Sequence, residues 1–153
     1  MKSFSDALQS IAVTLWVGGM WTIGFVVAPL LFARLPERVL AGLIAGKLFT
    51  LVAYIGIVCA LVLLLFRVAR FGAAALKQGN FWVVLLMLAL VLIGEFGVQP
   101  VLESLKTQAL PKEVMASIFR DRFDTWHGVA SGLYVIESLL GLVLVVWQNR
   151  GLK

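Results

Sequence analysis

The chain has 153 residues, of which 61% are hydrophobic and only 14% are charged. A soluble domain carries about 25% charged residues, and one small core cannot bury this much apolar surface, so a water-soluble domain is excluded and an integral membrane protein is predicted. The formal net charge is +5, but the basic residues are scattered, which argues against binding of nucleic acid and for attraction to the lipid bilayer, the expected partner.

Four apolar runs are long enough to cross a bilayer, which takes about 20 residues. They lie at about 8–32, 39–66, 81–98 and 128–147. Backbone polar groups in hydrocarbon must pair within their own segment, so each run is predicted to be a helix. We therefore expect an all-α fold, a four-helix transmembrane bundle that forms a single domain over residues 1–153. The first run is too long for the apolar part of a signal peptide and is expected to be retained.

Small residues cluster in the first two runs. Gly18 and Gly19 are adjacent in the first, and the second begins with two overlapping small-xxx-small patterns at 41–46. Small side chains let membrane helices approach closely. We therefore predict that Gly18, Gly19, Gly42 and Gly46 form packing surfaces, either inside the bundle or between the subunits of a homo-oligomer.

The connection between the third and fourth runs is long and mixes cations with acids. Beyond Pro111, its apolar residues gather on one half of a helix. This pattern predicts an additional amphipathic helix at about 112–126, which lies at the membrane interface or caps the bundle and runs into the fourth span.

The distribution of lysine and arginine predicts the orientation. Four spans place both termini on one side of the membrane, and the basic residues are equally numerous on the two sides. The second loop holds Arg67, Arg70 and Lys77 with no acid, and it lies close to the membrane, as does the basic C-terminus. These features favour a bacterial inner membrane with both termini in the cytoplasm.

The entry to the fourth span holds the strongest polar signal. His127, the one histidine of the chain, shares a helical stripe with Ser131 and Tyr134, and Glu137 lies on its flank near the middle of the span. A carboxylate at the bilayer centre costs about 2.5–3.5 kcal/mol on insertion scales, so such groups usually face protein or water. We therefore expect this stripe to face the interior of the bundle.

A second polar group is predicted to lie in the same half of the bundle as His127. Glu95 and Gln99 share a face of the third span, and Lys47 lies in the second span. One interpretation is structural: Glu95 pairs with Lys47, and His127 forms a hydrogen bond at the interface. The other is a polar pathway for a cation or a proton with Glu137 at its deepest point, because a buried carboxyl group can carry a proton.

Cofactor and enzyme signals are weak. His127 is the candidate metal ligand, and the sulfur atoms of the methionines and Cys59 would favour monovalent copper, but none of these residues has the spacing of a ligand motif. Haem is not expected, because one histidine allows bis-histidine ligation only across a dimer. The sequence shows no nucleophile–base pair, phosphate loop or zinc motif, so the protein is not expected to be an enzyme.

Five short motifs occur in a characteristic order. They are WVGG at 16–19, APLLF at 28–32, AGLIAGKLF at 41–49, QP at 99–100 and FDTWHGVAS at 123–131. Together they resemble the transmembrane protein 205-like family and its bacterial relatives, which are small four-span membrane proteins. The W-x-G-G opening is also similar to CopD-type copper-resistance membrane domains.

The resemblance adds expectations about the site. The F-x-x-x-H-G-x-x-S pattern of the family falls on Phe123, His127, Gly128 and Ser131, and Tyr134 stands where an asparagine is frequent. Both resemblances imply handling of soft metals. We therefore expect a non-enzymatic membrane protein that transports or handles a small solute or ion, including a soft metal such as copper. The alternative is an accessory or scaffold subunit whose polar residues are structural.

Overall fold

The computed structural model describes residues 2–109 and 116–150, and every element within them is helical. The predicted all-α fold is therefore confirmed. Four helices are long and apolar enough to cross a membrane, so the chain is a multi-pass membrane protein. They are Phe4–Arg34, Leu40–Lys77, Gly79–Lys106 and Arg120–Gln148.

Each of the first three spans is built from more than one helical segment. In chain order, the segments of all four spans are α1 (Lys2–Trp21), a π-helical turn (Thr22–Val27) and α2 (Ala28–Arg34); α3 (Arg38–Phe71) and a 3₁₀ turn (Gly72–Lys77); α4 (Gly79–Leu92), a second π-helical turn (Ile93–Val98) and α5 (Gln99–Ala109); and α6 (Ala116–Arg150). The amphipathic helix expected at about 112–126 is not a separate element where it is described, because residues 116–126 run without a break into the fourth span. Residues 112–115 lie outside the described residues.

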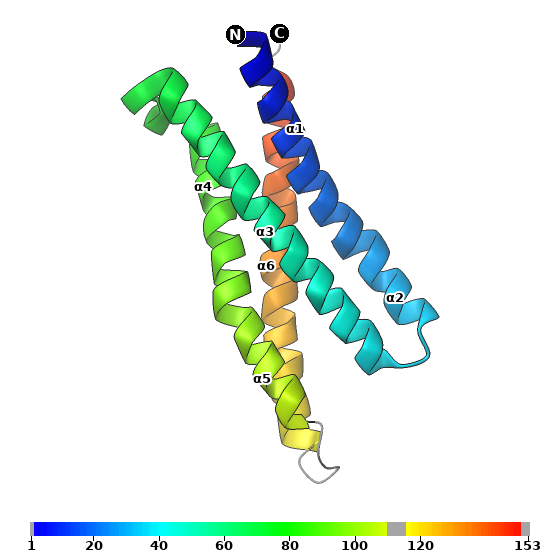
Figure 1. Cartoon of the computed structure of the whole chain (residues 1–153). Coiled ribbons are helices and arrows are strands. Elements are labelled where there is room, and N and C mark those ends of the chain that lie inside the picture. The colour runs from blue at the N-terminus through cyan, green and yellow to red at the C-terminus, as the bar shows by residue number, and fades with distance from the viewer. Residues whose placement is uncertain (1, 110–115, 151–153) are drawn as a thin grey trace.

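The four spans form a closed ring of neighbours. Contacts join α1 to α3, α3 to α4, α4 to α6 and α6 back to α1. The beginning of α1 and the end of α6 lie at the same end of the bundle, as four spans require (Figure 1). We call this the terminal end. The opposite end, where α2 turns into α3 and α5 leads toward α6, is called the loop end (Figure 1).

Local sequence explains where the spans end. Pro36 follows Leu35, whose backbone is extended and closes α2, as expected for a residue before proline. Gly72 ends α3 with a φ of 53°, a conformation that glycine adopts without steric cost. Both turns are short, so consecutive spans run antiparallel.

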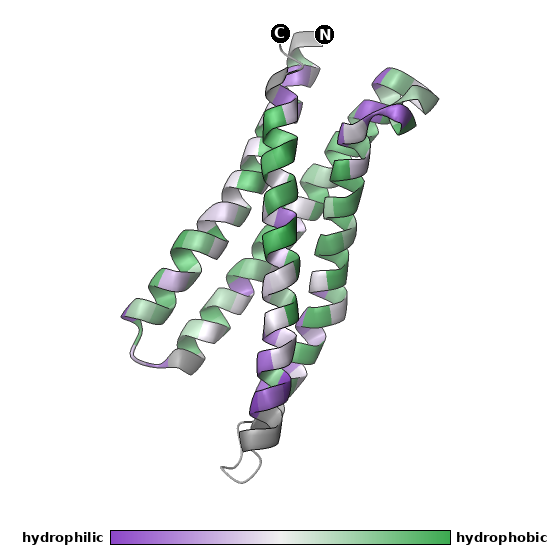
Figure 2. Cartoon of the chain, turned by 180° about the vertical axis from the view of Figure 1, so that it is seen from behind, coloured by the Kyte–Doolittle hydropathy of each residue, from purple (hydrophilic) through white to green (hydrophobic). Residues whose placement is uncertain are grey.

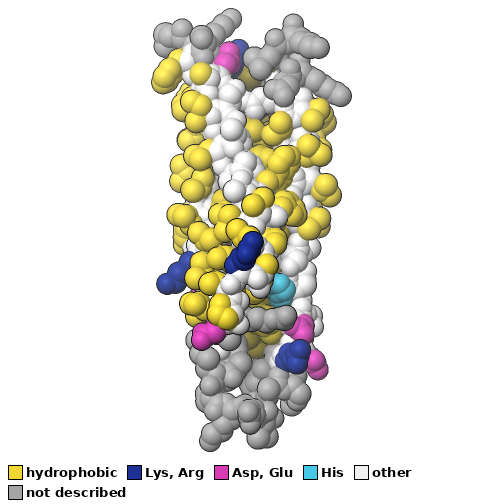
Figure 3. Space-filling model, turned by 90° about the vertical axis from the view of Figure 1, so that its right-hand side faces the viewer, with side chains coloured by type: hydrophobic (Ala, Val, Ile, Leu, Met, Phe, Trp, Pro, Cys, Tyr) yellow, Lys and Arg dark blue, Asp and Glu magenta, His cyan; other side chains and the backbone are white. Residues whose placement is uncertain are grey.

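The outer surface is apolar over the middle of the bundle. Hydrophobic residues cover the middle of each long helix, and hydrophilic residues concentrate toward the ends (Figure 2). The face in Figure 3 is also mostly hydrophobic, with an acidic and a basic side chain near its upper end and most of its charged side chains in its lower half. This is the surface that a bilayer requires.

The two halves of the bundle are packed differently. Toward the terminal end, buried apolar side chains of all four spans form a dense core that includes Trp16, Leu63, Met87 and Leu144. Toward the loop end, the first and third spans each contain a π-helical turn. Such turns bulge a helix and are frequent at functional sites, and the sequence alone did not predict them.

Candidate functional site

A cavity of about 380 Å³ lies between the four spans in the loop-end half. Its lining runs from Lys106 and Phe123, near the loop end, to Trp16 and Glu137, near the middle of the bundle. Six of the seven residues predicted from the sequence to form a polar site line it. They are His127, Ser131, Tyr134, Glu137, Glu95 and Gln99.

The deep end of the cavity is a buried carboxyl group. Glu137 is only 7% exposed, and the indole N–H of Trp16 forms a hydrogen bond with its side chain. Within residues 2–109 and 116–150, Glu137 forms no ion pair. Burial of a carboxylate without a countercharge is costly, so this group is poised to accept a proton or a cation.

Trp16 is held in place by close packing against the second span. It is 1% exposed, and a Cβ atom added at Gly56 would lie 2.4 Å from its Nε1 atom. Only glycine leaves room for the indole ring at this point of α3. The sequence did not indicate that Gly56 would determine the position of Trp16.

Tyr134 connects the fourth span to the first. Its hydroxyl group donates a hydrogen bond to the backbone carbonyl of Met20 over 2.5 Å, and its ring packs edge-on against Phe49 at a centroid distance of 5.1 Å. A Cβ atom at Gly24, within the first π-helical turn, would lie 2.3 Å from a ring carbon. Tyr134 therefore has a structural role as well as a place in the cavity wall.

The other polar groups of α6 are largely satisfied within their own helix. Ser131 donates to the carbonyl of His127 over 2.8 Å, and Ser138 donates to the carbonyl of Tyr134 over 2.7 Å. The imidazole of His127 is exposed and stacks on Phe123, with ring planes 10° apart and centroids 5.8 Å apart. His127 thus lies near the mouth of the cavity, and Glu137 lies at its end.

The third span contributes Glu95, which lies in the second π-helical turn. Its carboxylate accepts a hydrogen bond from the hydroxyl group of Thr50 over 3.4 Å. The expected pair with Lys47 is not formed, because Thr50 occupies the face of α3 toward Glu95 while Lys47 is exposed and does not line the cavity. Among the described residues, the ion pair joins Arg70 and Asp6 instead.

The four glycines predicted as packing positions behave differently from one another. Gly42 and Gly46 line the cavity. A Cβ atom at Gly19 would approach the side chain of Val52 to 3.3 Å, whereas one at Gly18 would meet open space. The closest helix contacts occur instead at Gly24 and Gly56, where an aromatic ring rather than a second small residue faces the glycine.

The possible metal ligands are dispersed. Within the described residues, no group of three or more histidine, cysteine, aspartate and glutamate side chains is arranged to hold a metal ion. Met20 and His127 both line the cavity, while Cys59 is packed in the apolar core of the terminal end.

A family model described as a domain of unknown function (DUF4149) matches residues 11–111. The matched range begins within the first span, contains the second and third spans, both π-helical turns and Glu95, and ends before α6. No curated protein and no solved structure gives a significant match to the chain.

Proposed function

The chain belongs to the DUF4149 family, and we propose that it transports or handles a small cationic solute or ion, which enters the cavity between its spans. One observation carries this proposal: a cavity of about 380 Å³ ends on the buried carboxyl group of Glu137. A cation that reaches this group supplies the positive charge that no described residue provides.

The remaining lining supports a cationic ligand. Aromatic side chains supply much of the wall, among them Trp16, Phe25, Phe49 and Tyr134. The face of an aromatic ring attracts cations, and the attraction grows when water is excluded. Glu95 adds a second carboxylate to the lining, from the third span.

The cavity occupies one half of the bundle, which favours entry from the loop end. The apolar core that includes Trp16 and Met87 closes the terminal end. Transport across the bundle requires this core to open, and the π-helical turns supply points at which the first and third spans can bend. The all-basic second loop supports a bacterial inner membrane with both termini in the cytoplasm, so in this proposal the cavity faces away from the cytoplasm.

A soft metal ion is the second candidate for the transported species. The thioether of Met20 and the imidazole of His127 line the same cavity, and such ligands favour monovalent copper. The resemblance to the transmembrane protein 205-like family and to CopD-type domains supports the same ion. Here His127 would be a metal ligand near the mouth.

Filling the cavity tests the proposal without changing a charge. Gly94 lines the cavity, and Gly97 of the same π-helical turn does not; a Cβ atom at either position would meet open space. In proteoliposomes, Gly94→Leu is expected to reduce uptake of tetramethylammonium to the level of empty vesicles, whereas Gly97→Leu keeps wild-type uptake. Monovalent copper, with His127→Ala as a third variant, serves as the probe for the second candidate.

Two outcomes would overturn the proposal. If the wild-type protein takes up neither probe, or if Gly94→Leu and Gly97→Leu take them up equally, the cavity has no role in transport. The scaffold interpretation then explains the polar residues, because the bond from Tyr134 to Met20 already ties two spans together.

A further inference from the structure

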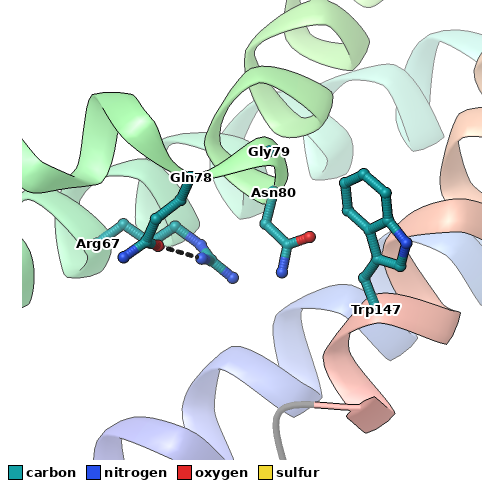
Figure 4. A pocket seen from close by; sticks show the side chains of 5 residues that line it. All are labelled: Arg67, Gln78, Gly79, Asn80 and Trp147. Atoms are coloured by element: carbon teal, nitrogen blue, oxygen red, sulfur yellow. Dashed lines mark hydrogen bonds between the residues drawn. The ribbon is translucent and has the colours of Figure 1, made fainter.

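A second pocket lies at the terminal end, away from the cavity and independent of the function proposed for it. Its volume is about 480 Å³, and it is lined by Arg67, Gln78, Gly79, Asn80 and Trp147. The guanidinium group of Arg67 and the carboxamide of Asn80 lie side by side below the turn between α3 and α4, with the indole of Trp147 across from them (Figure 4).

Arg67 is the charged group of this pocket, and its bonding is incomplete. Its Nη1 atom donates a hydrogen bond to Oε1 of Gln78 over 2.8 Å, but its Nε atom is buried and has no hydrogen-bond partner. A buried donor without a partner costs free energy. The pocket is therefore lined by a permanently charged group whose donors are only partly satisfied within the protein.

No carboxylate neutralises Arg67 in the described part of the chain. The carboxylate of Asp6 binds the neighbouring Arg70 at 2.5 Å instead. The turn from Arg67 to Asn80 contains no acidic residue. The positive charge of Arg67 is therefore available for an anion from outside the chain.

The start of α4 reinforces the preference for an anion. The helix begins at Gly79, and the residue before it, Gln78, makes no side-chain bond to cap its N-terminus. The first backbone N–H groups of a helix lack partners within the helix and carry the positive end of its dipole, so they bind phosphate groups well. Arg67 and this helix end thus converge on one space.

From this arrangement we propose that the pocket binds the phosphate of an anionic phospholipid headgroup. A lipid is favoured over free phosphate by the location of the pocket. It lies beside Trp147, where the second span ends and the third begins. The side chains of Leu76, in the turn between these spans, and Trp82, in the first turns of α4, are apolar and exposed. Basic pockets between membrane helices, near the headgroup level, bind anionic lipids in this way.

The experiment uses the full chain in nanodiscs of phosphatidylcholine with increasing phosphatidylglycerol, and counts retained lipids by native mass spectrometry. Arg67→Gln is expected to weaken retention of phosphatidylglycerol by about tenfold, the effect of losing one charge-assisted hydrogen bond. Arg70→Gln is the matched control, because it removes the same charge from a residue that is outside the pocket and paired with Asp6. It should retain the lipid as the wild type does.

Two further arms keep the test decisive. Arg67→Lys preserves the charge but lacks the planar guanidinium group that binds phosphate through two donors, so intermediate retention supports the geometry proposed here, even if Arg67→Gln fails to fold. Equal losses in Arg67→Gln and Arg70→Gln would show that only general surface charge matters and would overturn the site. If the wild type binds inorganic phosphate in phosphatidylcholine nanodiscs but does not retain phosphatidylglycerol selectively, the assignment to a lipid is overturned.

Discussion

Glu137→Gln is expected to lower the affinity for tetramethylammonium by about tenfold to a hundredfold. The substitution removes the negative charge at the deep end of the cavity, and the attraction between two unit charges about 4 Å apart is on the order of 1–4 kcal/mol in surroundings that range from water to a protein surface. Glutamine has the same shape and retains an oxygen that can accept the bond from the Trp16 indole. The fold should therefore survive while the binding is lost. Calorimetry on the protein in nanodiscs measures the affinity.

Glu103→Gln is the matched control for this prediction. Glu103 lies in α5 near the same end of the bundle, but it is exposed and does not line the cavity. It should bind the probe as the wild type does. Equal affinity of the wild type and Glu137→Gln would contradict the role of the buried carboxylate, whatever the control shows.

Gly56→Ala is expected to destabilise the protein by about 1–3 kcal/mol, the usual cost of forcing an extra group into a packed interior. The new methyl group would lie 2.4 Å from Nε1 of Trp16, which is almost fully buried and cannot move aside. Alanine is favoured over glycine in a helix by about 1 kcal/mol, so the loss would appear despite a better helix former. Thermal unfolding in detergent measures the change.

Gly132→Ala isolates the effect of packing from that of helix propensity. Gly132 lies in α6, and a Cβ atom there would meet open space. This variant should be at least as stable as the wild type. If Gly56→Ala is as stable as Gly132→Ala, the close contact with α3 does not restrict the position of the Trp16 indole. The hydrogen bond from Trp16 to Glu137 would then be held in place less firmly than the structure indicates.

The sequence predicted the spans and the polar stripe because both depend on local chemistry. The length of an apolar run determines whether it can cross a bilayer, so four spans could be identified without any tertiary contact. The period of a helix likewise placed His127, Ser131 and Tyr134 on one face, with Glu137 on its flank. Antiparallel order then placed Glu95 and Gln99 in the same half, and all six residues line one cavity.

The features that could not be predicted depend on which side chain meets which across the bundle. Lys47 was grouped with Glu95 by its depth in the membrane, but its direction around α3 leaves it exposed, and Thr50 takes its place. The tight contacts at Gly24 and Gly56 each require a particular aromatic partner from another span. The π-helical turns have no simple sequence signal, although both fall within segments that contain glycine.

The most direct test of the central claim is whether water reaches the cavity from the loop end. A cysteine is placed at Gly94 in a Cys59→Ala chain, and a second chain carries Leu142→Cys on the exposed apolar surface of α6. A membrane-impermeant cationic thiol reagent added from the loop side should modify the cysteine at 94 rapidly and the one at 142 slowly, and tetramethylammonium should protect the first. Slow or unprotected labelling at 94, or equal labelling from the terminal side, would contradict a cavity that opens toward the loop end and receives a cation.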